Sequence, residues 1–195
     1  MTIRPFTDDD IAAAAAMSFD AWSFEMPDER RDFKLFIYEY IIRFYDINRN
    51  YSFAYTDADG VQAVLLAGFK NDTNSHVGWF ADKLHGCAPR ERQIALQYKQ
   101  YLEFNGQALK EHAAENDMLL NLFISRKPGC GGLLLEKLET CCQTDKIRHI
   151  YLWSDGTCNL HYYAKRGFAR LKQFYNRILL TEPLETIIYV KKTAV

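Results

Sequence analysis

The sequence lacks a long apolar run, an excess of one charge and a segment typical of a secretory signal. Without a run of membrane-spanning length, no transmembrane helix is predicted. The 24 basic and 25 acidic residues leave a net charge of −1, which argues against a dedicated nucleic-acid-binding protein because such proteins carry a basic excess. The N-terminus has no apolar segment of the kind that directs secretion. We therefore expect a cytoplasmic protein that binds neither a membrane nor a nucleic acid.

Paired cysteines are also missing. The chain has five cysteines, an odd number, and no C-x-x-C spacing. Together with the missing signal, this pattern is typical of free thiols in a reducing compartment. Neither the cysteines nor the histidines show the spacing of metal ligands, so no metal site is predicted. Cys130 lies in a glycine-rich segment, but the sequence places no histidine to activate it as a nucleophile.

The remaining composition suits one globular α/β domain spanning residues 1–195. The chain is 48% hydrophobic and 25% charged, and it is long enough to bury a substantial core. Alternating and helical apolar patterns predict the elements of a mixed sheet with helices between its strands. Residues 71–86 are polar and are expected to form a long loop with some local order. Strands are expected at 2–6, 51–56, 61–70, 119–124, 147–153, 168–175 and 186–191. Helices are expected at 11–22, 33–44, 89–116, 133–142 and 155–165.

The most informative segment is residues 126–132, which read R-K-P-G-C-G-G. It follows the strand-like run 119–124 and precedes a helical pattern that begins at Leu133. Glycines allow a ligand close to the backbone, and the unpaired N–H groups and dipole at a helix start favour an anion. The segment therefore predicts a ligand that carries phosphate. A tight strand-to-helix connection without a ligand is the alternative.

Two motifs make the sequence similar to the GNAT acetyltransferase family. The family's acyl-CoA signature, [Q/R]-x-x-G-x-[G/A], is matched by residues 126–131, and the leucine pair that usually follows is Leu134 and Leu135. The second family motif is an Asn followed by an aromatic–Tyr pair and then x-x-x-G-F. Asn159 and residues 162–168 match it. The resemblance is strong over residues 117–175. In the N-terminal half, only the general pattern of elements matches the family.

The resemblance implies an α/β fold with a mixed, mostly antiparallel, twisted sheet of about seven strands and helices on both faces. It also implies acetyl-CoA as co-substrate, lying in the V between two splayed strands. In the family, the backbone of the central strand bonds the pantetheine arm and the glycine turn cradles the pyrophosphate. The residues that the resemblance assigns to cofactor binding are Leu122, Phe123, Ile124, Arg126, Lys127, Gly129, Cys130, Gly131, Gly132 and Asn159.

By the same resemblance, Tyr163 aligns with the tyrosine that protonates the departing CoA thiolate. A phenol with a pKa near ~10 is a usable acid for a thiol with a pKa near ~8.5. The neighbouring Tyr162 is the alternative acid. The chain is thus expected to be a GNAT-type acyltransferase that moves an acetyl group from acetyl-CoA directly to a primary amine.

Two departures from the family pattern affect the glycine turn. Only Ser125 separates the strand from Arg126, and Pro128 removes one N–H donor. These departures favour a second reading, a non-catalytic acyl-CoA-binding or regulatory module on the same fold. A third reading, an unrelated nucleotide-binding sheet, is disfavoured because no G-K-[ST] is present.

No motif specifies the acceptor, which is expected to be a small-molecule or peptide amine. Glu25 and Trp22 lie near the junction of the first two helices, where the family builds its acceptor pocket, and they are assigned to substrate binding. The aromatic residues of the second helix are read first as core, with a wall for an apolar acceptor as the alternative. A homodimer through an edge strand is expected as a further partner. The general-base candidates are Glu25, Asp72, His76, Asp117 and Asp155.

Overall fold

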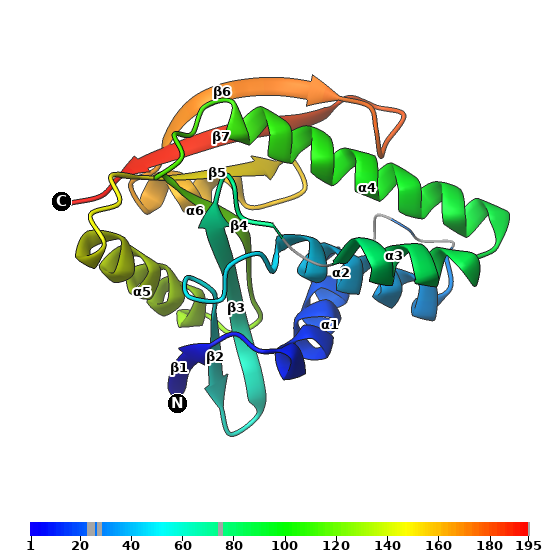
Figure 1. Ribbon diagram of the computed structural model, residues 1–195, viewed down its shortest axis with the longest axis horizontal. Helices are drawn as coiled ribbons and strands as arrows, with labels where there is room; N and C mark the ends of the chain where they lie inside the picture. Colours follow the sequence, from blue (N-terminus) through cyan, green and yellow to red (C-terminus); the bar gives the residue numbers. More distant parts are fainter. Residues whose placement is uncertain (23–25, 27–28, 74–75, 195) are drawn as a thin grey trace.

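The computed structural model describes residues 1–22, 26, 29–73 and 76–194 (Figure 1). A seven-stranded sheet runs through the molecule in the order β1-β2-β3-β4-β5-β7-β6. The central pair, β4 and β5, is parallel, and every other neighbouring pair is antiparallel. The strands are β1 (Thr2–Pro5), β2 (Phe53–Asp57), β3 (Gly60–Phe69), β4 (Met118–Ser125), β5 (His149–Asp155), β6 (Ala169–Asn176) and β7 (Leu184–Lys192).

Helices cover both faces of this sheet (Figure 1). Side chains alternate along a strand, so Val64 and Leu66 of β3 join the core under the first four helices, while Leu65 joins the core under the last two. The expected mixed, mostly antiparallel sheet with helices on both faces is confirmed. Among the described residues, no helix combines the length and apolar character needed to cross a membrane. The helices are α1 (Ile11–Trp22), α2 (Arg31–Tyr45), α3 (His76–His85), α4 (Pro89–Lys110), α5 (Cys130–Thr144) and α6 (Leu160–Lys165).

The expectation of a loop over residues 71–86 is wrong, because most of that segment is the helix α3. The Phe80 ring stacks on the Tyr40 ring of α2 with a centroid distance of 4.0 Å, and the Arg43 guanidinium lies 4.7 Å from the Trp79 ring. Phe80 is the one buried residue of this helix. Contacts with α2 therefore stabilise this helix, whose apolar residues Trp79, Phe80 and Leu84 pack on the core between polar neighbours.

The boundary between β5 and α6 also differs from expectation. Residue 155 was expected to begin a helix, but Asp155 ends β5, paired with Thr186 of β7, and the helix begins at Leu160. The Gly156 N–H donates to the Glu185 carbonyl over 2.9 Å, which extends the contact with β7. Strand pairing with a distant segment thus overrides the local helical pattern and places the Asp155 carboxylate at the carboxyl end of a strand.

The parallel strands β4 and β5 are neighbours over only a short length. Their register contains two pairs, Met118 with Ile150 and Leu119 with Tyr151. Asn121 then forms a bulge in β4, since Leu120 and Leu122 face consecutive residues of β3. Beyond the bulge, β4 stays paired with β3 and β5 with β7, so the two strands diverge. The facing edges of β4 and β5 therefore lack a strand partner in the described structure.

Candidate active site

A cavity of about 480 Å³, here called the cofactor groove, lies at the open end of the divergent strands beside the start of α5. Nearly all of the residues that the sequence assigned to cofactor binding lie along it. Leu122 lines the adjoining central cavity instead, and Cys130 is buried beneath the turn with 5% of its surface exposed. The predicted residues that line the cofactor groove are Phe123, Ile124, Arg126, Lys127, Gly129, Gly131, Gly132, Asn159 and Tyr163.

The glycine turn has the backbone geometry of an anion site. Gly129 caps α5 at a φ of 87°, a left-handed conformation that glycine adopts without strain. A Cβ added to Gly131 would lie 2.7 Å from Cζ of Phe123, so only glycine fits between the helix and β4. The first N–H groups of α5, including those of Gly131 and Gly132, have no intrahelical acceptor. Both glycines line the cofactor groove at this helix start, where a phosphate is expected.

The turn offers fewer donors than the sequence led us to expect. The Arg126 N–H donates to the Gln62 carbonyl over 3.0 Å, and the Cys130 N–H donates to the Lys127 carbonyl over 3.3 Å. Pro128 has no N–H at all. The candidate phosphate cradle is therefore narrower than residues 126–132 and is centred on the glycines of α5.

Three basic side chains surround this cradle, and one of them was missed from the sequence. The Lys127 ammonium is held by Asp57 at 2.6 Å, and the Arg126 guanidinium lies 3.6 Å from Asp20. Arg166 was not assigned a role, yet its guanidinium covers Gly132 so closely that an added Cβ would lie 2.2 Å from its Nη2. Its position directly before the Gly-Phe of the second motif was the available signal. Arg166 therefore places a guanidinium directly against the start of α5.

Tyr163 lies where the cofactor groove meets the central cavity, since it lines both. Gly167 ends α6 at a φ of 83°, and the Phe168 N–H donates back to the Tyr163 carbonyl over 3.0 Å. The Tyr163 ring packs between Phe168 and Tyr189, with centroid distances of 5.9 Å and 5.5 Å. Burial raises the pKa of the Tyr163 hydroxyl well above its ordinary value, so the group is protonated at neutral pH.

The central cavity, about 110 Å³ in volume, lies between the divergent strands. Its walls are largely aromatic. Asp155 is the one acidic side chain among the described residues that line it, and 8% of this residue is exposed. The Asp155 carboxylate accepts hydrogen bonds from the Tyr101 hydroxyl and from the N–H and hydroxyl of Thr157. The aromatic residues of the wall are Trp22, Tyr38, Tyr45, Tyr98, Tyr101, Phe123, Trp153 and Tyr163.

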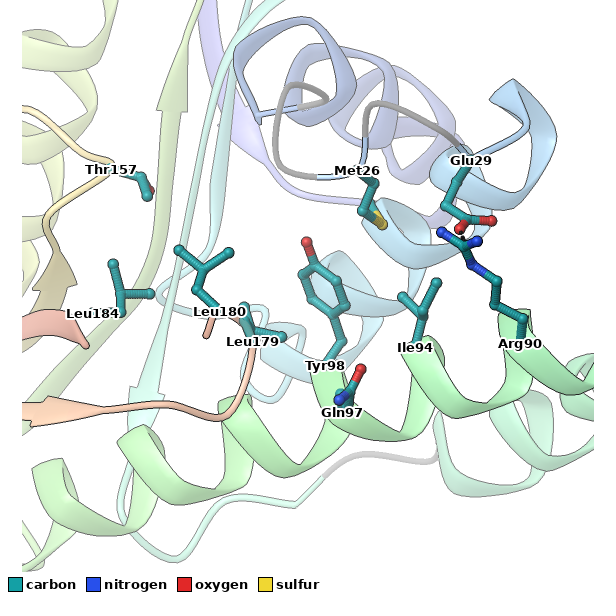
Figure 2. A pocket seen from close by; sticks show the side chains of 10 residues that line it. All are labelled: Met26, Glu29, Arg90, Ile94, Gln97, Tyr98, Thr157, Leu179, Leu180 and Leu184. Atoms are coloured by element: carbon teal, nitrogen blue, oxygen red, sulfur yellow. Dashed lines mark ion pairs between the residues drawn. The ribbon is translucent and has the colours of Figure 1, made fainter. Parts of the chain in front are cut away.

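A third cavity, the outer cavity, has a volume of about 200 Å³ and lies between α4 and the segment that joins β6 to β7 (Figure 2). Figure 2 shows Met26, Ile94 and Leu179 around the Tyr98 side chain, with the ion pair of Glu29 and Arg90 at one end. That pair is 2.9 Å long. The outer cavity shares Tyr98, Thr157 and Leu179 with the central cavity. The three cavities therefore adjoin one another, and Thr157 lines all three.

Trp22, assigned to substrate binding, lines both the cofactor groove and the central cavity, whereas Glu25 lies outside the described residues. Of the other general-base candidates, His76 packs against the Tyr40 and Phe44 rings, and the two carboxylates accept hydrogen bonds from nearby groups. Asp117 is bound by the Ala114 N–H and His149 at the paired end of β4, and Asp72 accepts from Asn48 and the Phe69 N–H. Neither carboxylate lines the central cavity. The described residues contain no group of three metal-ligating side chains.

Comparison with solved structures identifies the fold. An N-acetyltransferase from Staphylococcus aureus Mu50 aligns with a TM-score of 0.59 at 16% identity, covering 97% of this chain and 100% of its own. A protein from Desulfovibrio desulfuricans assigned to the GNAT acetyltransferases aligns with a TM-score of 0.59 at 12% identity, covering 99% of each chain. The C-terminal condensation domain of Ebony, in complex with beta-alanyl-dopamine, aligns with a TM-score of 0.67 at 12% identity, covering 98% of each chain.

These alignments span nearly the whole chain, and they show that it has the fold of the GNAT acetyltransferases. The resemblance inferred from the two motifs is thereby confirmed at the level of the fold. No protein-family model matches the sequence, and no curated protein matches it significantly. The identities are too low for the comparisons to specify a reaction, so the activity rests on the chemistry of the site.

Proposed function

We propose that the chain is an N-acetyltransferase that uses acetyl-CoA and transfers the acetyl group directly to a primary amine. One observation carries the proposal: Tyr163 lies at the junction between a glycine-lined anion groove and a buried cavity that opens between two diverging strands. Acetyl-CoA placed across that junction would have its diphosphate at the start of α5 and its acyl carbon beside the central cavity. The fold neighbours, described as acetyltransferases, support the same class of reaction.

The cofactor groove supplies charge and backbone donors at its two ends. The N–H groups of Gly131 and Gly132, with the Arg126 and Arg166 guanidinium groups, would hold the diphosphate. The unpaired edge of β4 from Leu122 to Ile124 would bond the pantetheine amides and polarise the thioester carbonyl. Phe123 packs against Gly131 and fixes the distance between these two parts of the groove.

Tyr163 is the general acid in this proposal. The hydroxyl is protonated at neutral pH, since burial raises its pKa further above that of an ordinary phenol, and Tyr163 lines both the cofactor groove and the central cavity. A protonated phenol donates to a thiolate as the C–S bond breaks. Tyr162 also lines the cofactor groove but not the central cavity, so it stands farther from the place where the acyl group would be transferred.

The first experiment is a thermal unfolding series with acetyl-CoA, CoA, ATP and NAD, followed by thiol release with a panel of amines. A ligand at a hundredfold excess over its Kd stabilises a protein by about 2.7 kcal/mol, which raises Tm by roughly 5–10 °C for a chain of this length. We expect both CoA forms to raise Tm and ATP and NAD to have little effect. No shift with either CoA form would refute the proposal.

A second function is favoured by the narrow phosphate cradle. Because Arg126, Pro128 and Cys130 contribute no available N–H, the groove would bind acyl-CoA less tightly than a full glycine turn. The alternative is a non-catalytic acyl-CoA-binding module. A Tm shift with acetyl-CoA but no thiol release across the whole amine panel would favour it. The predicted homodimer through the edge strands β1 or β6 stays a prediction.

A further inference from the structure

We propose that the acceptor is a monoamine with a flat, apolar aromatic body, that it enters through the outer cavity, and that Asp155 binds its ammonium group. This inference rests on the proposed acetyl transfer and names its substrate class. Among the described residues, three features point to it: a buried carboxylate with no cationic partner, aromatic walls around that carboxylate, and no second unpaired charged side chain along the route.

Asp155 is a buried anion whose charge is not balanced by the described part of the chain. Among those residues, no lysine, arginine or histidine forms an ion pair with it. The donors from Tyr101 and Thr157 are neutral. A buried carboxylate without a counterion is costly, and a cation that enters the cavity removes that cost. The site is therefore complementary to an ammonium group.

The walls beside Asp155 select the body of the acceptor. The Trp153 and Tyr101 rings meet edge to face at a centroid distance of 5.6 Å, and Trp22 and Tyr38 meet at 6.4 Å. Aromatic side chains bury a flat apolar group well and also stabilise a nearby cation. An aryl group one or two carbons from the amine places its ring against these walls while its nitrogen reaches Asp155.

The outer cavity disfavours acceptors that carry a second charge. Its acidic residue, Glu29, is already paired with Arg90, so neither side chain offers an unbalanced charge to a ligand. The remaining lining is mainly apolar, with Met26, Ile94 and Leu179 facing the space (Figure 2). Against the described lining residues, a polyamine would leave its distal ammonium without a partner, and an amino acid would bring its own carboxylate beside Asp155.

The transfer step balances with the groups present. The Asp155 carboxylate accepts one proton from the bound ammonium, and the neutral amine forms the C–N bond with the thioester carbonyl carbon. The C–S bond then breaks, and the thiolate takes the Tyr163 proton. The nitrogen releases its second proton, which restores Tyr163 through water, while Asp155 returns its proton to solvent. The products are the N-acetyl amine, CoA thiol and one proton.

The test compares 2-phenylethylamine, spermidine and glycine as acceptors at saturating acetyl-CoA. We expect kcat/KM for 2-phenylethylamine to exceed that of each other amine by about 10- to 100-fold, the discrimination expected when a buried charge or apolar group is mismatched. Preference for spermidine or glycine, with acetyl-CoA binding intact, would overturn the inference and leave the proposed function standing. Failure of acetyl-CoA to bind would instead refute the proposed function.

Two variants distinguish an effect on the amine acceptor from an effect on acetyl-CoA binding. Asp155→Asn should lower kcat/KM for 2-phenylethylamine by about 100-fold, while the Tm shift with acetyl-CoA stays unchanged. Asp117→Asn is the matched control, since Asp117 is equally buried, accepts a backbone N–H and lies away from the cavities. Leu179→Trp should narrow the passage and raise the KM for the amine about tenfold, and Leu179 does not line the cofactor groove.

Direct binding provides a readout that does not depend on transfer. We expect 2-phenylethylamine to raise the Tm of the unsubstituted protein and to have little effect on the Asp155→Asn variant, with or without CoA present. Equal shifts in the two proteins would contradict the inference, because the carboxylate would then make no contact with the ammonium. Full activity in Asp155→Asn would contradict it as well.

Discussion

The hydroxyl of Tyr101 donates a hydrogen bond to Oδ2 of Asp155, across a separation of 54 positions in the chain. Tyr101 lies in the middle of α4, and Asp155 ends β5. Both are buried, with 4% and 8% of their surfaces exposed. Helix α4 therefore does more than cover the sheet, because it holds the one carboxylate that lines the central cavity of the described structure.

Replacing Tyr101 by Phe removes this donor and little else. We expect a loss of about 1–3 kcal/mol in the free energy of unfolding, because a buried carboxylate loses a hydrogen-bond partner. Amine kcat/KM should also fall, while acetyl-CoA binding stays unchanged. Denaturant unfolding and thiol release measure the two effects. Tyr175→Phe is the control, since Tyr175 is 59% exposed and its loss should stay within about 0.5 kcal/mol. Equal stability of the two variants would contradict the assigned bond.

Tyr163→Phe tests the general acid. We expect kcat to fall by about 10²- to 10⁴-fold, while the Tm shift with acetyl-CoA is retained. Because burial raises the pKa of Tyr163, its hydroxyl stays protonated through pH values near ~10, and it should not set an alkaline limit on the activity of the unsubstituted protein below that range. Tyr162→Phe is the matched control. If the two variants keep equal kcat values, Tyr163 is not the acid.

Arg166→Gln tests the basic group that the sequence alone did not identify. Loss of a charge-assisted contact with phosphate should raise the Kd for acetyl-CoA about tenfold, and the difference from the unsubstituted protein should shrink at high salt. Isothermal titration at two ionic strengths measures both effects. Arg170→Gln, which changes an exposed residue of β6, should leave the Kd unchanged. An unaltered Kd in Arg166→Gln would place this guanidinium outside the phosphate site.

Cys158 reports on occupancy of the cofactor groove. Its side chain is partly exposed and lines both the groove and the central cavity. Acetyl-CoA should therefore slow its alkylation by iodoacetamide, as measured by mass spectrometry of the labelled peptides. The partly exposed Cys87 and Cys141 should label at unchanged rates. Burial raises the pKa of Cys142 to about 12, so this thiol should label slowly in every condition. Equal protection of all sites would indicate general stabilisation instead.

Asp10 should make the stability pH-dependent in acid. Burial by itself raises the pKa of Asp10, but hydrogen bonds from Arg4 and Thr7 outweigh it and hold the pKa below its ordinary 3.8. The group therefore contributes its full stability above pH 3.8, and this contribution disappears as the pH falls through the lower value of the folded state. Asp10→Asn should lose stability at pH 6 and show a smaller further loss in acid. If the free energy of unfolding fell equally with decreasing pH in the unsubstituted protein and in Asp10→Asn, Asp10 would not be the source of this pH dependence.

Much of the fold and of the cofactor groove was predictable from residues that are close in sequence. Strand, glycine turn and helix follow one another over residues 119–142, so the conformational freedom of glycine and the unpaired N–H groups at the start of α5 belong to a local segment. The end of α6 is also set by residues that are close in sequence. Gly167 and Phe168 end this helix, and the Phe168 N–H donates to the Tyr163 carbonyl. Local chemistry of this kind depends little on the rest of the molecule.

The acceptor side depended on contacts between distant segments, and the sequence offered no means to rank them. From the sequence alone, Asp155 is one of several general-base candidates. In the structure, β7 pairs with the end of β5, and α4 places the Tyr101 hydroxyl beside the Asp155 carboxylate. Helix α3 packs its Phe80 ring on Tyr40 of α2, a contact between segments that are distant in sequence. Arg166 covers the start of α5 from a different helix. The sequence by itself determined the fold class and the glycine turn, whereas tertiary packing decided which buried charge faces the cavity, because burial and the pairing of charges are properties of the assembled chain.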